Sequence, residues 1–350
     1  MQRLVIATTA TSAPMGAQVY QEEVAARAAE ALEATGGGWT VDRFIARSLR
    51  SPLPGTARLP FGRLRHAGRR ERRAIGSVVY PRDALLHRME LELPPARHEV
   101  LTMHDTVAWR YPDEGQPVAA AAEELRAAAA VICVSRYTAE DIAERFGVDR
   151  LHVVHNGVDD RFRGAEPLTS AELAALGIDG RYLLHAGGAA ARKNLEGLAA
   201  AWDLLHGSHP DVSLVLSGPQ HPRRDHLFGD LPRAIRVGRL PENVLPPLMS
   251  GAQAVVVPSH HEGFGLPALE AMAAGAPVVV AATSSLTEVA AEAGVMVGTT
   301  GAEIAEGLDY VLGSDFPRDR YVAAGRRHAA PFTWERSAKG HAEVWRSVGG

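Results

Sequence analysis

Short apolar runs and amphipathic segments alternate along this chain in two successive series, and this alternation is what most restricts its fold. The first series opens with the β-rich run "RLVIATTA" (3–10), followed by "VYQEEVAARAAEALEAT" (19–35) at helical spacing. A second series restarts at "YLLHAGG" (182–188) and continues through "AVVVPS" (254–259). Strands that alternate with helices are typical of parallel sheets covered on both faces. The sequence therefore predicts an α/β protein with two doubly wound, Rossmann-like domains.

The two series are separated by a segment that is dense in glycine and proline. Residues 156–180 read "NGVDDRFRGAEPLTSAELAALGIDG", which predicts a linker containing a short helix capped by Thr169 or Ser170. A length of 350 residues also favours two cores over one.

We therefore place an N-terminal domain at 1–165, a C-terminal domain at 166–330, and a final amphipathic helix at 331–350 that crosses back to the first domain. In doubly wound sheets, ligands bind outside the carboxyl ends of the strands. We expect these ends of the two domains to face a central cleft.

Composition excludes several classes of protein. The net charge of −4 is not that of a nucleic-acid-binding protein. Cys133 is the only cysteine, so there is neither a disulfide framework nor a cysteine metal cluster. No run of about 20 apolar residues occurs. We expect a cytoplasmic protein, and we keep peripheral association with the inner membrane face as an alternative.

The stretch "HHEGFGLPALEAMAAGAPVVV" carries two glutamates at the end of a predicted strand. Pro267 suits the first turn of a helix and Gly275 suits its end. Glu262 should then lie in the loop between strand and helix, with Glu270 about one turn into the helix.

This arrangement suits a nucleotide. Gly263 and Gly265 allow the backbone to approach a ligand closely, and the helix N-terminus favours an anion such as a diphosphate. Glu270 could accept two hydrogen bonds from a vicinal diol such as a ribose, and Glu262 would meet the group beyond the phosphates. The alternative is that each glutamate is only a dipole partner on a solvated helix face.

A second candidate element follows the strand predicted at 182–186. It is a glycine-rich loop ending in Arg192 and Lys193, with Asn194 opening a helix. Arginine and lysine can neutralise phosphate oxygens, although the pair could also be an ordinary exposed one. The motif of nucleoside triphosphatase phosphate loops is not matched here. Neither D-x-D nor H-E-x-x-H occurs in the sequence, so we expect no required metal.

A third candidate element is "TMHD", in which His104 and Asp105 follow a predicted strand of the first domain. Their position favours hydrogen bonding to a polar substrate. A lone histidine of this kind can equally be structural.

Several longer stretches resemble glycosyltransferase family 4, which are retaining transferases of the GT-B fold. The matching stretches are "TMHDTVAWRYPDE" (102–114), "VSRYTAEDIAERFGVDRLHVVHNGVD" (134–159), "GRLPENVLPPLMSGAQAVVVPSHHEGFGLPALEAMAAGAPVVV" (238–280) and "FTWERSA" (332–338). The resemblance implies a nucleotide-sugar donor in the second domain and an acceptor in the first. It also implies metal-independent transfer in which the leaving phosphate helps to deprotonate the acceptor.

The resemblance assigns roles residue by residue. Glu270 would bind the ribose, Glu262 the donor sugar, and Arg192 with Lys193 the diphosphate. His104 would lie near the sugar and the attacking hydroxyl, with Asp105 on the acceptor. Together the implied catalytic and donor-binding residues are His104, Gly16, Arg192, Lys193, Glu262, Gly263, Phe264, Gly265, Leu266 and Glu270.

The chain also departs from the family pattern. Gly16 stands alone where a glycine pair is common, and Gly188 stands where some members carry an arginine. The second departure places more of the phosphate binding on Arg192 and Lys193. The sequences of the "TMHD" and "EGFGLPALEAMA" motifs are most similar to those of mannosyltransferase-type members, which favours GDP-mannose over a UDP-sugar as donor.

Two other functions remain open. The chain could be an inactive nucleotide-sugar-binding protein. It could also be an NAD-dependent oxidoreductase, because "GFGLPA" (263–268) fits the dinucleotide fingerprint with Glu288 downstream.

The basic stretch "RLPFGRLRHAGRRERRAIG" (58–76) has two interpretations. Arg63–Arg73 could dock an anionic acceptor or an anionic membrane surface. Alternatively, the stretch is an arginine-rich solvated loop and helix, since its apolar stripe is weak.

Overall fold

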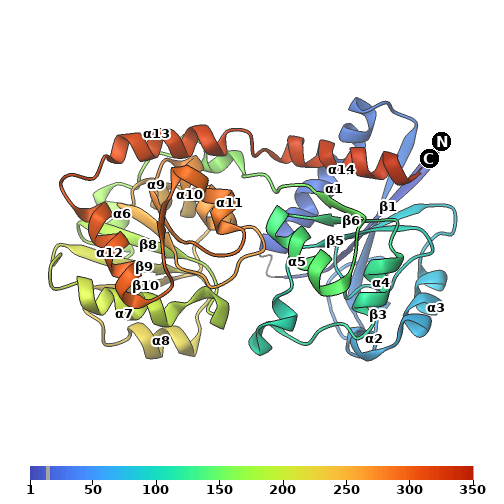
Figure 1. Cartoon of the computed structure of the whole chain (residues 1–350), viewed down its shortest axis with the longest axis horizontal. Helices are drawn as coiled ribbons and strands as arrows, with labels where there is room; N and C mark the ends of the chain where they lie inside the picture. Colours follow the sequence, from blue (N-terminus) through green and yellow to red (C-terminus); the bar gives the residue numbers. More distant parts are fainter. Residues whose placement is uncertain (13–15, 350) are drawn as a thin grey trace. The chain divides into compact units, whose positions relative to one another are not determined.

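The chain folds into two compact units, each with its own parallel sheet (Figure 1). The computed structural model describes residues 1–12 and 16–349. The first unit combines Met1–Gly157 with Phe332–Gly350, and the second is Val158–Pro331. The predicted linker, 156–180, therefore belongs to the second unit from Val158 onwards. There, the buried ring of Phe162 fixes the 3₁₀ turn η3 (Asp160–Phe162), which packs on helices of that unit.

The first unit is built on a seven-stranded sheet with the order β3-β2-β1-β4-β5-β6-β7. All of its pairs are parallel, as the sequence predicted. The strands are β1 (Gln2–Thr9), β2 (Trp39–Ser48), β3 (Ala57–Leu59), β4 (Leu85–Arg88), β5 (Glu99–Met103), β6 (Ala130–Cys133) and β7 (Leu151–Val153).

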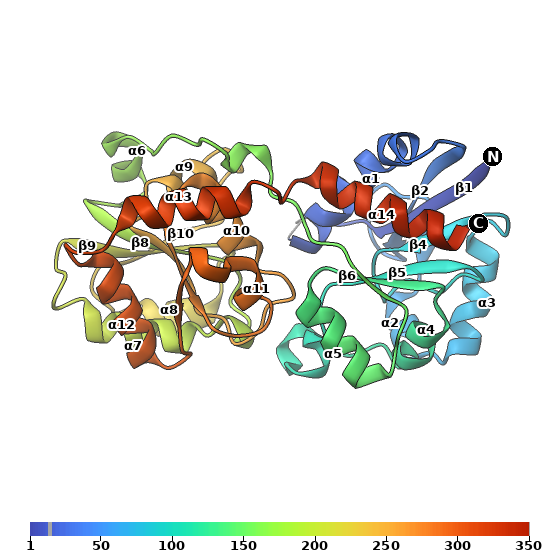
Figure 2. The same ribbon diagram turned by 45° about the horizontal axis from the view of Figure 1, so that its top comes forward.

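Helices cover this sheet (Figure 2). They are α1 (Gly16–Ala34), α2 (Phe61–His66), α3 (Arg69–Val79), α4 (Ala121–Ala127), α5 (Arg136–Phe146), α14 (Trp334–Gly349) and the short turns η1 (Val107–Trp109) and η2 (Pro112–Glu114). The central strands β4, β5 and β6 are buried along their whole length. β6 is entirely apolar, as expected of a strand covered on both faces, whereas β4 and β5 also bury polar side chains: His87, Arg88, Glu99 and Thr102.

The C-terminal helix α14 packs against α1 of the same unit. Both views show the two helices side by side (Figures 1 and 2). Its apolar face includes Trp334, Ala338 and Trp345, all buried. The predicted final amphipathic helix is therefore present. It completes the core of a unit whose other residues, Met1–Gly157, are separated from it in the chain by the whole second unit.

One predicted strand was placed wrongly. We expected "SVVYPRDALLH" (77–87) to be extended, yet Ser77–Val79 form the last turn of α3 and β4 begins only at Leu85. β-Branched residues favour strands only weakly when they stand alone. Here the packing of α3 favours the helix over a strand, because Gly76 of this helix lies against the Pro95 backbone where no side chain would fit.

The second unit has a six-stranded parallel sheet with the order β10-β9-β8-β11-β12-β13. The strands are β8 (Arg181–Ala186), β9 (Val212–Ser217), β10 (Ala234–Gly238), β11 (Ala254–Val257), β12 (Val278–Ala281) and β13 (Val295–Val297). The helices are α6 (Ser170–Ala175), α7 (Leu195–Leu205), α8 (Pro222–Phe228), α9 (Leu245–Ser250), α10 (Leu266–Ala274), α11 (Leu286–Ala290), α12 (Gly301–Leu312) and α13 (Arg318–Ala329), with the 3₁₀ turns η3, η4 (Ala191–Lys193) and η5 (Ala291–Ala293). Thr169 caps α6 in a reciprocal capping box with Glu172, so the first of the two predicted caps is confirmed.

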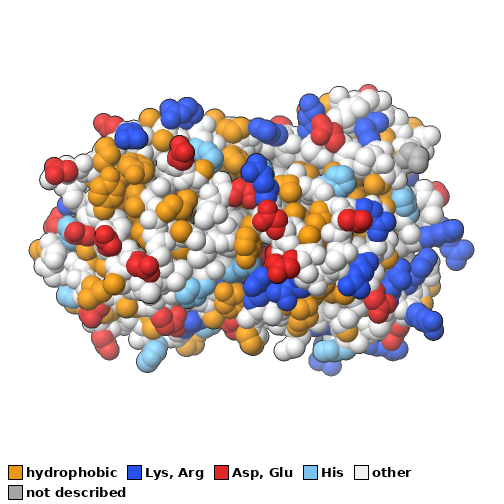
Figure 3. Space-filling view, viewed as in Figure 1, with side chains coloured by type: hydrophobic (Ala, Val, Ile, Leu, Met, Phe, Trp, Pro, Cys, Tyr) orange, Lys and Arg blue, Asp and Glu red, His pale blue; other side chains and the backbone are white. Residues whose placement is uncertain are grey.

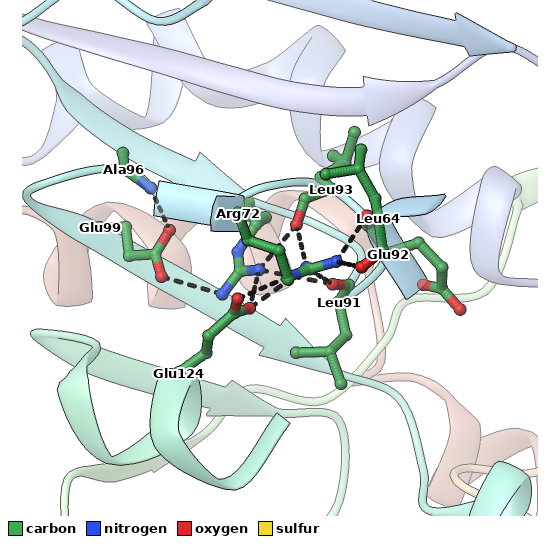
Figure 4. A network of polar contacts seen from close by, with 9 residues as sticks. Leu64, Arg72, Leu91, Glu92, Leu93, Ala96, Glu99 and Glu124 are labelled. Atoms are coloured by element: carbon green, nitrogen blue, oxygen red, sulfur yellow. Dashed lines mark hydrogen bonds and ion pairs between the residues drawn. The ribbon is translucent and has the colours of Figure 1, made fainter. Parts of the chain in front are cut away.

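A buried ionic network lies inside the first unit (Figure 4). The Arg72 Nε lies 2.6 Å from the Glu124 carboxylate. Arg88 bridges Glu124 and Glu99 at 2.6 and 2.9 Å. All four side chains are almost fully removed from solvent. Two arginines thereby neutralise two carboxylates, as buried charges require.

This network corrects the prediction for the basic stretch. Arg72 was expected on a docking surface or a solvated face, but its side chain is fully buried. It also donates to four backbone carbonyls, those of Leu64, Leu91, Glu92 and Leu93. Its partner Glu124 lies 52 residues further along the chain, so no local pattern could reveal the pairing.

Candidate functional site

The second unit brings two loops together at the carboxyl ends of neighbouring strands. β8 and β11 pair in the middle of the sheet. Since parallel strands end at the same edge, the loop after β8 meets the loop after β11. The amide of His260 donates to the carbonyl of Arg192 at 2.7 Å, which ties the loops directly.

Glu262, Arg192 and Lys193 form the centre of this site. The Glu262 carboxylate accepts hydrogen bonds from Lys193 Nζ at 2.6 Å, Arg192 Nη1 at 2.8 Å and Ser259 Oγ at 2.8 Å. From the sequence, we expected the two cations to bind the diphosphate and the carboxylate to contact the donor sugar. In this structure they contact one another.

The electrostatics of Glu262 follow from this contact. Burial by itself would raise the pKa of its carboxyl, since the charged form loses water. The charges of Lys193 and Arg192 and the hydrogen bonds of Lys193 and Ser259 outweigh burial and lower the pKa to about 2. Glu262 is therefore ionised at neutral pH and is compensated by two cations.

Helix α10 begins directly after this loop, as predicted. Gly265 precedes it with φ 101°, in the left-handed region, and Pro267 stands in its first turn. No side chain caps this end, and the Ala268 amide bonds the Gly265 carbonyl at 3.0 Å. Because proline has no N–H, Leu266 carries the first-turn amide that is open to an anion among the described residues. Gly275 ends the helix with φ 87°. These boundaries place Glu262 in the loop and Glu270 in the helix.

Two serines hold the loop in place, and the sequence analysis missed both. The Glu262 amide donates to Ser284 Oγ at 2.9 Å. The hydroxyl of Ser285 bonds the carbonyls of Glu262 and Phe264 at 2.8 and 2.9 Å. The glycine-rich segment is thus a fixed turn rather than a free loop.

Glu270 lies in a different environment from Glu262. Its side chain is partly buried, and burial raises the pKa of its carboxyl to about 7, with Asp159 raising it further and Arg161 opposing the shift. Arg161 bonds Asp159 at 2.9 Å and Glu242 at 2.7 Å. Within the described part of the chain, the Glu270 carboxylate makes no hydrogen bond, which leaves its oxygens available to a ligand.

His104 and Asp105 follow β5 in the first unit. Burial lowers the pKa of His104 to about 4, although a hydrogen bond to the backbone of Met89 opposes the shift. The ring meets Tyr20 edge-on, with centroids 4.7 Å apart. The buried Nε2 atom has no hydrogen-bond partner among residues 1–12 and 16–349. His104 is therefore a neutral imidazole. The carboxylate of Asp105 accepts from the Val107 amide at 3.0 Å and so shapes η1.

A chain of buried hydrogen bonds lies behind His104. His341 Nδ1 lies 2.7 Å from the Ser337 carbonyl and must donate to it, so its Nε2 accepts from Tyr20 Oη at 2.6 Å. Tyr20 then accepts from the Thr102 hydroxyl at 2.8 Å.

The same logic continues to the other end of α14. Thr102 accepts from His87 Nε2 at 2.8 Å, and His87 Nδ1 accepts from Trp345 Nε1 at 3.2 Å. The donor and the acceptor of each hydrogen bond on this path are thus assigned, and both of its histidines, His87 and His341, are neutral. The chain starts and ends on α14 and passes through α1, β4 and β5.

The remaining predicted residues are placed less completely. Gly16 is the first residue of α1, and residues 13–15 before it lie outside the described residues. The "GFGLPA" segment follows β11, whereas the first strand of that unit is β8. A dinucleotide fingerprint belongs after the first strand.

Among the described residues, no cluster of three or more His, Cys, Asp or Glu side chains is arranged to hold a metal ion. In the same residues, no helix is long and apolar enough to cross a membrane.

Two family models match the chain. The model "Glycosyltransferase Family 4" matches residues 22–162, and "Glycosyl transferases group 1" matches residues 173–328. Among curated relatives, the O-antigen chain mannosyltransferase B of Escherichia coli is 32% identical over 226 residues, covering 61% of this chain and 59% of the relative. The D-inositol 3-phosphate glycosyltransferase of Frankia alni is 35% identical over 210 residues, covering 55% and 52%. The chain thus spans little more than half the length of these relatives.

Solved structures share the whole fold. Sucrose-phosphate synthase from Thermosynechococcus elongatus superimposes with a TM-score of 0.72 at 23% identity, covering 99% of each chain. Anabaena HepE, solved in complex with UDP-glucose, gives a TM-score of 0.73 at 17% identity, covering 99% of this chain and 100% of that one. The glycosyltransferase WaaG gives 0.70 at 16% identity, covering 97% and 99%.

Proposed function

Since this chain has the GT-B fold and belongs to glycosyltransferase family 4, we propose that it transfers a hexose from a nucleotide sugar to an acceptor hydroxyl with retention of configuration. The acceptor would be a glycan, a lipid-linked sugar or a small molecule. The observation that carries this proposal is the contact of Glu262 with Arg192 and Lys193 beside the uncapped N-terminus of α10.

The donor would bind with its diphosphate at the two cations and the Leu266 amide at the start of α10. Arg192 and Lys193 would then share their charge between Glu262 and the phosphate oxygens. Glu270, one turn into α10 with an unbonded carboxylate, would accept from the ribose diol. Glu262 would face the hexose, where its negative charge stabilises positive charge that develops on the sugar ring.

In the transfer, the acceptor oxygen forms a bond to the anomeric carbon while the bond from that carbon to the phosphate oxygen breaks. The acceptor proton passes to the departing phosphate oxygen, so the products are the glycoside and a nucleoside diphosphate. Attack occurs on the face from which the phosphate leaves, which retains the configuration. The cations at the phosphate supply the charge that a metal would otherwise supply, so we propose metal-independent transfer.

We propose mannose as the hexose and GDP as the nucleotide. Support comes from the similarity of the motif sequences to mannosyltransferase-type members and from the name of the E. coli relative. Other relatives and neighbours carry names that involve inositol phosphate, glycogen and UDP-glucose, so the donor is the finer part of the proposal.

Residues of the first unit would handle the acceptor. The His104 ring forms a hydrogen bond to the backbone of Met89, and its buried Nε2 atom has no hydrogen-bond partner among the described residues. As a neutral imidazole, it offers a lone pair to a hydroxyl group and adds no charge. Asp105, which follows it in the chain, would contact the acceptor.

A donor panel tests the proposal. The chain is incubated with GDP-mannose, GDP-glucose, UDP-glucose and UDP-galactose, and release of nucleoside diphosphate is measured with and without excess EDTA. We expect release with GDP-mannose that survives EDTA. Binding without any release, with every acceptor class offered, would support the inactive binding protein. Loss of release in EDTA that magnesium restores would contradict metal independence.

We also propose that the first unit docks on an anionic membrane surface. The arginines that would contact the surface exclude Arg72, because its side chain is buried. Figure 3 shows Lys and Arg side chains gathered along the edge of that unit where α3 lies. Arg69, Arg73 and Arg97 line one pocket, whose lining also includes Glu99 and Glu124 of the buried network. Within the described residues none of the three arginines forms an ion pair. Arg63 pairs with Glu71 at 2.6 Å, so it contributes less free charge. Unpaired arginines on one face suit phosphate headgroups.

A matched pair of double variants tests this docking. Arg69→Glu with Arg73→Glu should abolish sedimentation with vesicles that contain anionic phospholipid, and raised salt should weaken the wild type. Arg320→Glu with Arg327→Glu makes the same change in net charge on the second unit and should leave binding intact. Equal loss in both variants, or no binding by the wild type, would contradict a docking face at α3.

A further inference from the structure

Arg224 of α8 is a buried arginine without a carboxylate partner. Its side chain is almost fully buried, with 3% of the residue exposed. Throughout residues 1–12 and 16–349 it forms no ion pair with any acidic group. Burial accordingly lowers the pKa of its guanidinium. A buried charge is costly unless polar groups surround it, so its neighbours need an explanation.

Backbone carbonyls surround this guanidinium. Arg224 donates to the carbonyl of Gly187, and more weakly to those of Gly188 at 3.4 Å, Ser217 at 3.3 Å and Pro219 at 3.3 Å. The first two belong to the loop after β8, which leads to Arg192 and Lys193. Gly218 has φ 139°, and a Cβ there would meet Arg224 and the Gly187 carbonyl, so the site is shaped for this contact.

The contact fixes the direction of two peptide groups. In a trans peptide the C=O and the following N–H point in opposite directions. Because the carbonyls of Gly187 and Gly188 point at Arg224, the amides of Gly188 and Ala189 point away from it. Both residues are partly exposed. In the described part of the chain, neither amide donates a backbone hydrogen bond.

Two neighbouring amides that point out of a loop form a concave site for anions. We propose that Arg224 is a positioning residue that holds the Gly188 and Ala189 amides as a cradle for a phosphate of the donor. This inference rests on the proposed function, since it names a further part of the diphosphate site. It also accounts for Gly188, which stands where some family members carry an arginine: backbone amides supply the donors that the missing side chain would have given.

The test compares Arg224→Met with a matched control. Arg318 also binds only backbone carbonyls, those of Ala252 and Gln253, and burial also lowers its pKa. It lies at the amino end of β11, at the opposite edge of the sheet. Titration calorimetry measures the binding of inorganic pyrophosphate, of GDP and UDP, and of guanosine and uridine to the full chain.

We expect Arg224→Met to weaken binding of pyrophosphate and of the nucleoside diphosphate by about tenfold, the loss of roughly one good hydrogen bond to an anion. Binding of the nucleosides should not change, and Arg318→Met should bind all ligands as the wild type does. Ala189→Pro removes one of the amides without touching the buried charge and should reproduce the loss. It therefore tests the cradle even if Arg224→Met unfolds, which thermal unfolding would reveal.

The outcomes separate this inference from the proposed function. If the wild type binds nucleoside diphosphates and both Arg224→Met and Ala189→Pro bind them unchanged, the cradle is wrong and the donor site stands. If the wild type binds pyrophosphate in an Arg224-dependent manner but no nucleotide, the cradle stands and the proposed donor is wrong. Equal losses for nucleosides and nucleoside diphosphates would mean that Arg224 only supports the fold, which contradicts the inference.

Discussion

The ammonium group of Lys193 lies 2.6 Å from the carboxylate of Glu262, although 69 residues separate them in the chain. Together with the contacts of Arg192, it joins the loop after β8 to the loop after β11. It places a fixed negative charge directly beside the cations that we assign to the diphosphate.

Glu262→Gln should separate binding from turnover. The neutral amide keeps the size of the side chain but leaves Arg192 and Lys193 without their carboxylate, so nucleoside diphosphate should bind as tightly as in the wild type or more tightly. Turnover should fall by a factor of about 10²–10³, because charge on the sugar ring loses its partner. Calorimetry and single-turnover rates measure the two effects. Glu242→Gln, at a largely exposed carboxylate, is the control. A variant with weakened nucleotide binding and normal turnover would refute this role.

Glu262 should also contribute to acid unfolding. Its pKa is lowered to about 2 from a usual value near 4.5. The ionised form is thus favoured in the folded state, and its stabilisation is fully present above the unfolded pKa and is lost as the pH falls towards 2. The shift corresponds to about 3 kcal/mol. Thermal unfolding followed from neutral pH to about pH 3 should show a shallower loss of stability in Glu262→Gln than in the wild type. Parallel curves would show that the pair contributes nothing.

Glu270 should show the opposite pH behaviour. Burial raises its pKa to about 7, so its contribution to folding is fully present below about 4.5 and is lost as the pH rises through 7. Only the ionised form accepts both hydrogen bonds of a ribose diol. Nucleoside affinity should therefore increase as the pH rises through about 7, and Arg161→Met should move this midpoint upward. NMR titration with guanosine avoids the ionisation of phosphate. The dependence should vanish in Glu270→Gln, and its persistence there would exclude Glu270 as its source.

Tyr20→Phe should test the hydrogen-bond chain behind His104. The change removes one hydroxyl and leaves His341 Nε2 and the Thr102 hydroxyl without their partner in a fully buried place. The free energy of unfolding should fall by about 1–3 kcal/mol. Chemical denaturation measures it. Tyr310→Phe changes a half-exposed ring and should stay within about 0.5 kcal/mol of the wild type. Equal, small effects would mean that the chain adds no stability.

Gly157→Ala should disturb the place where two distant segments touch. A Cβ at Gly157 would lie 2.5 Å from the carbonyl carbon of Thr333 and 2.7 Å from Trp334 Cα, and backbone atoms cannot rotate away. We expect a loss of about 1–3 kcal/mol in stability, typical of overpacking. Gly207→Ala meets no atom within 4 Å and is the matched control. A variant as stable as the control would show that the segments separate freely.

The sequence predicted those parts of the fold that depend on local signals. The β/α alternation, the stop at Gly275 and the cap at Thr169 are properties of neighbouring residues, and the structure contains all three. Site residues at the ends of strands could be proposed for the same reason, because strand ends mark ligand sites in parallel sheets.

What could not be predicted depends on partners far along the chain. Arg72 looks like a surface residue until Glu124 is placed beside it. Arg224 carries no signal in the sequence, since its partners are backbone carbonyls. Ser284 and Ser285 are ordinary residues whose role appears only when α11 lies against the Glu262 loop.

The place of α14 has a consequence for how the protein is made. The helix belongs to the first unit, yet the ribosome synthesises residues 158–331 before it reaches Trp334. Until then, Tyr20 and His87 lack the histidine and tryptophan that they bond in the finished protein. The nascent first unit therefore waits with an open apolar face while the second unit emerges. Synthesis of α14, rather than completion of the first sheet, therefore sets the moment at which the first unit can reach its final state.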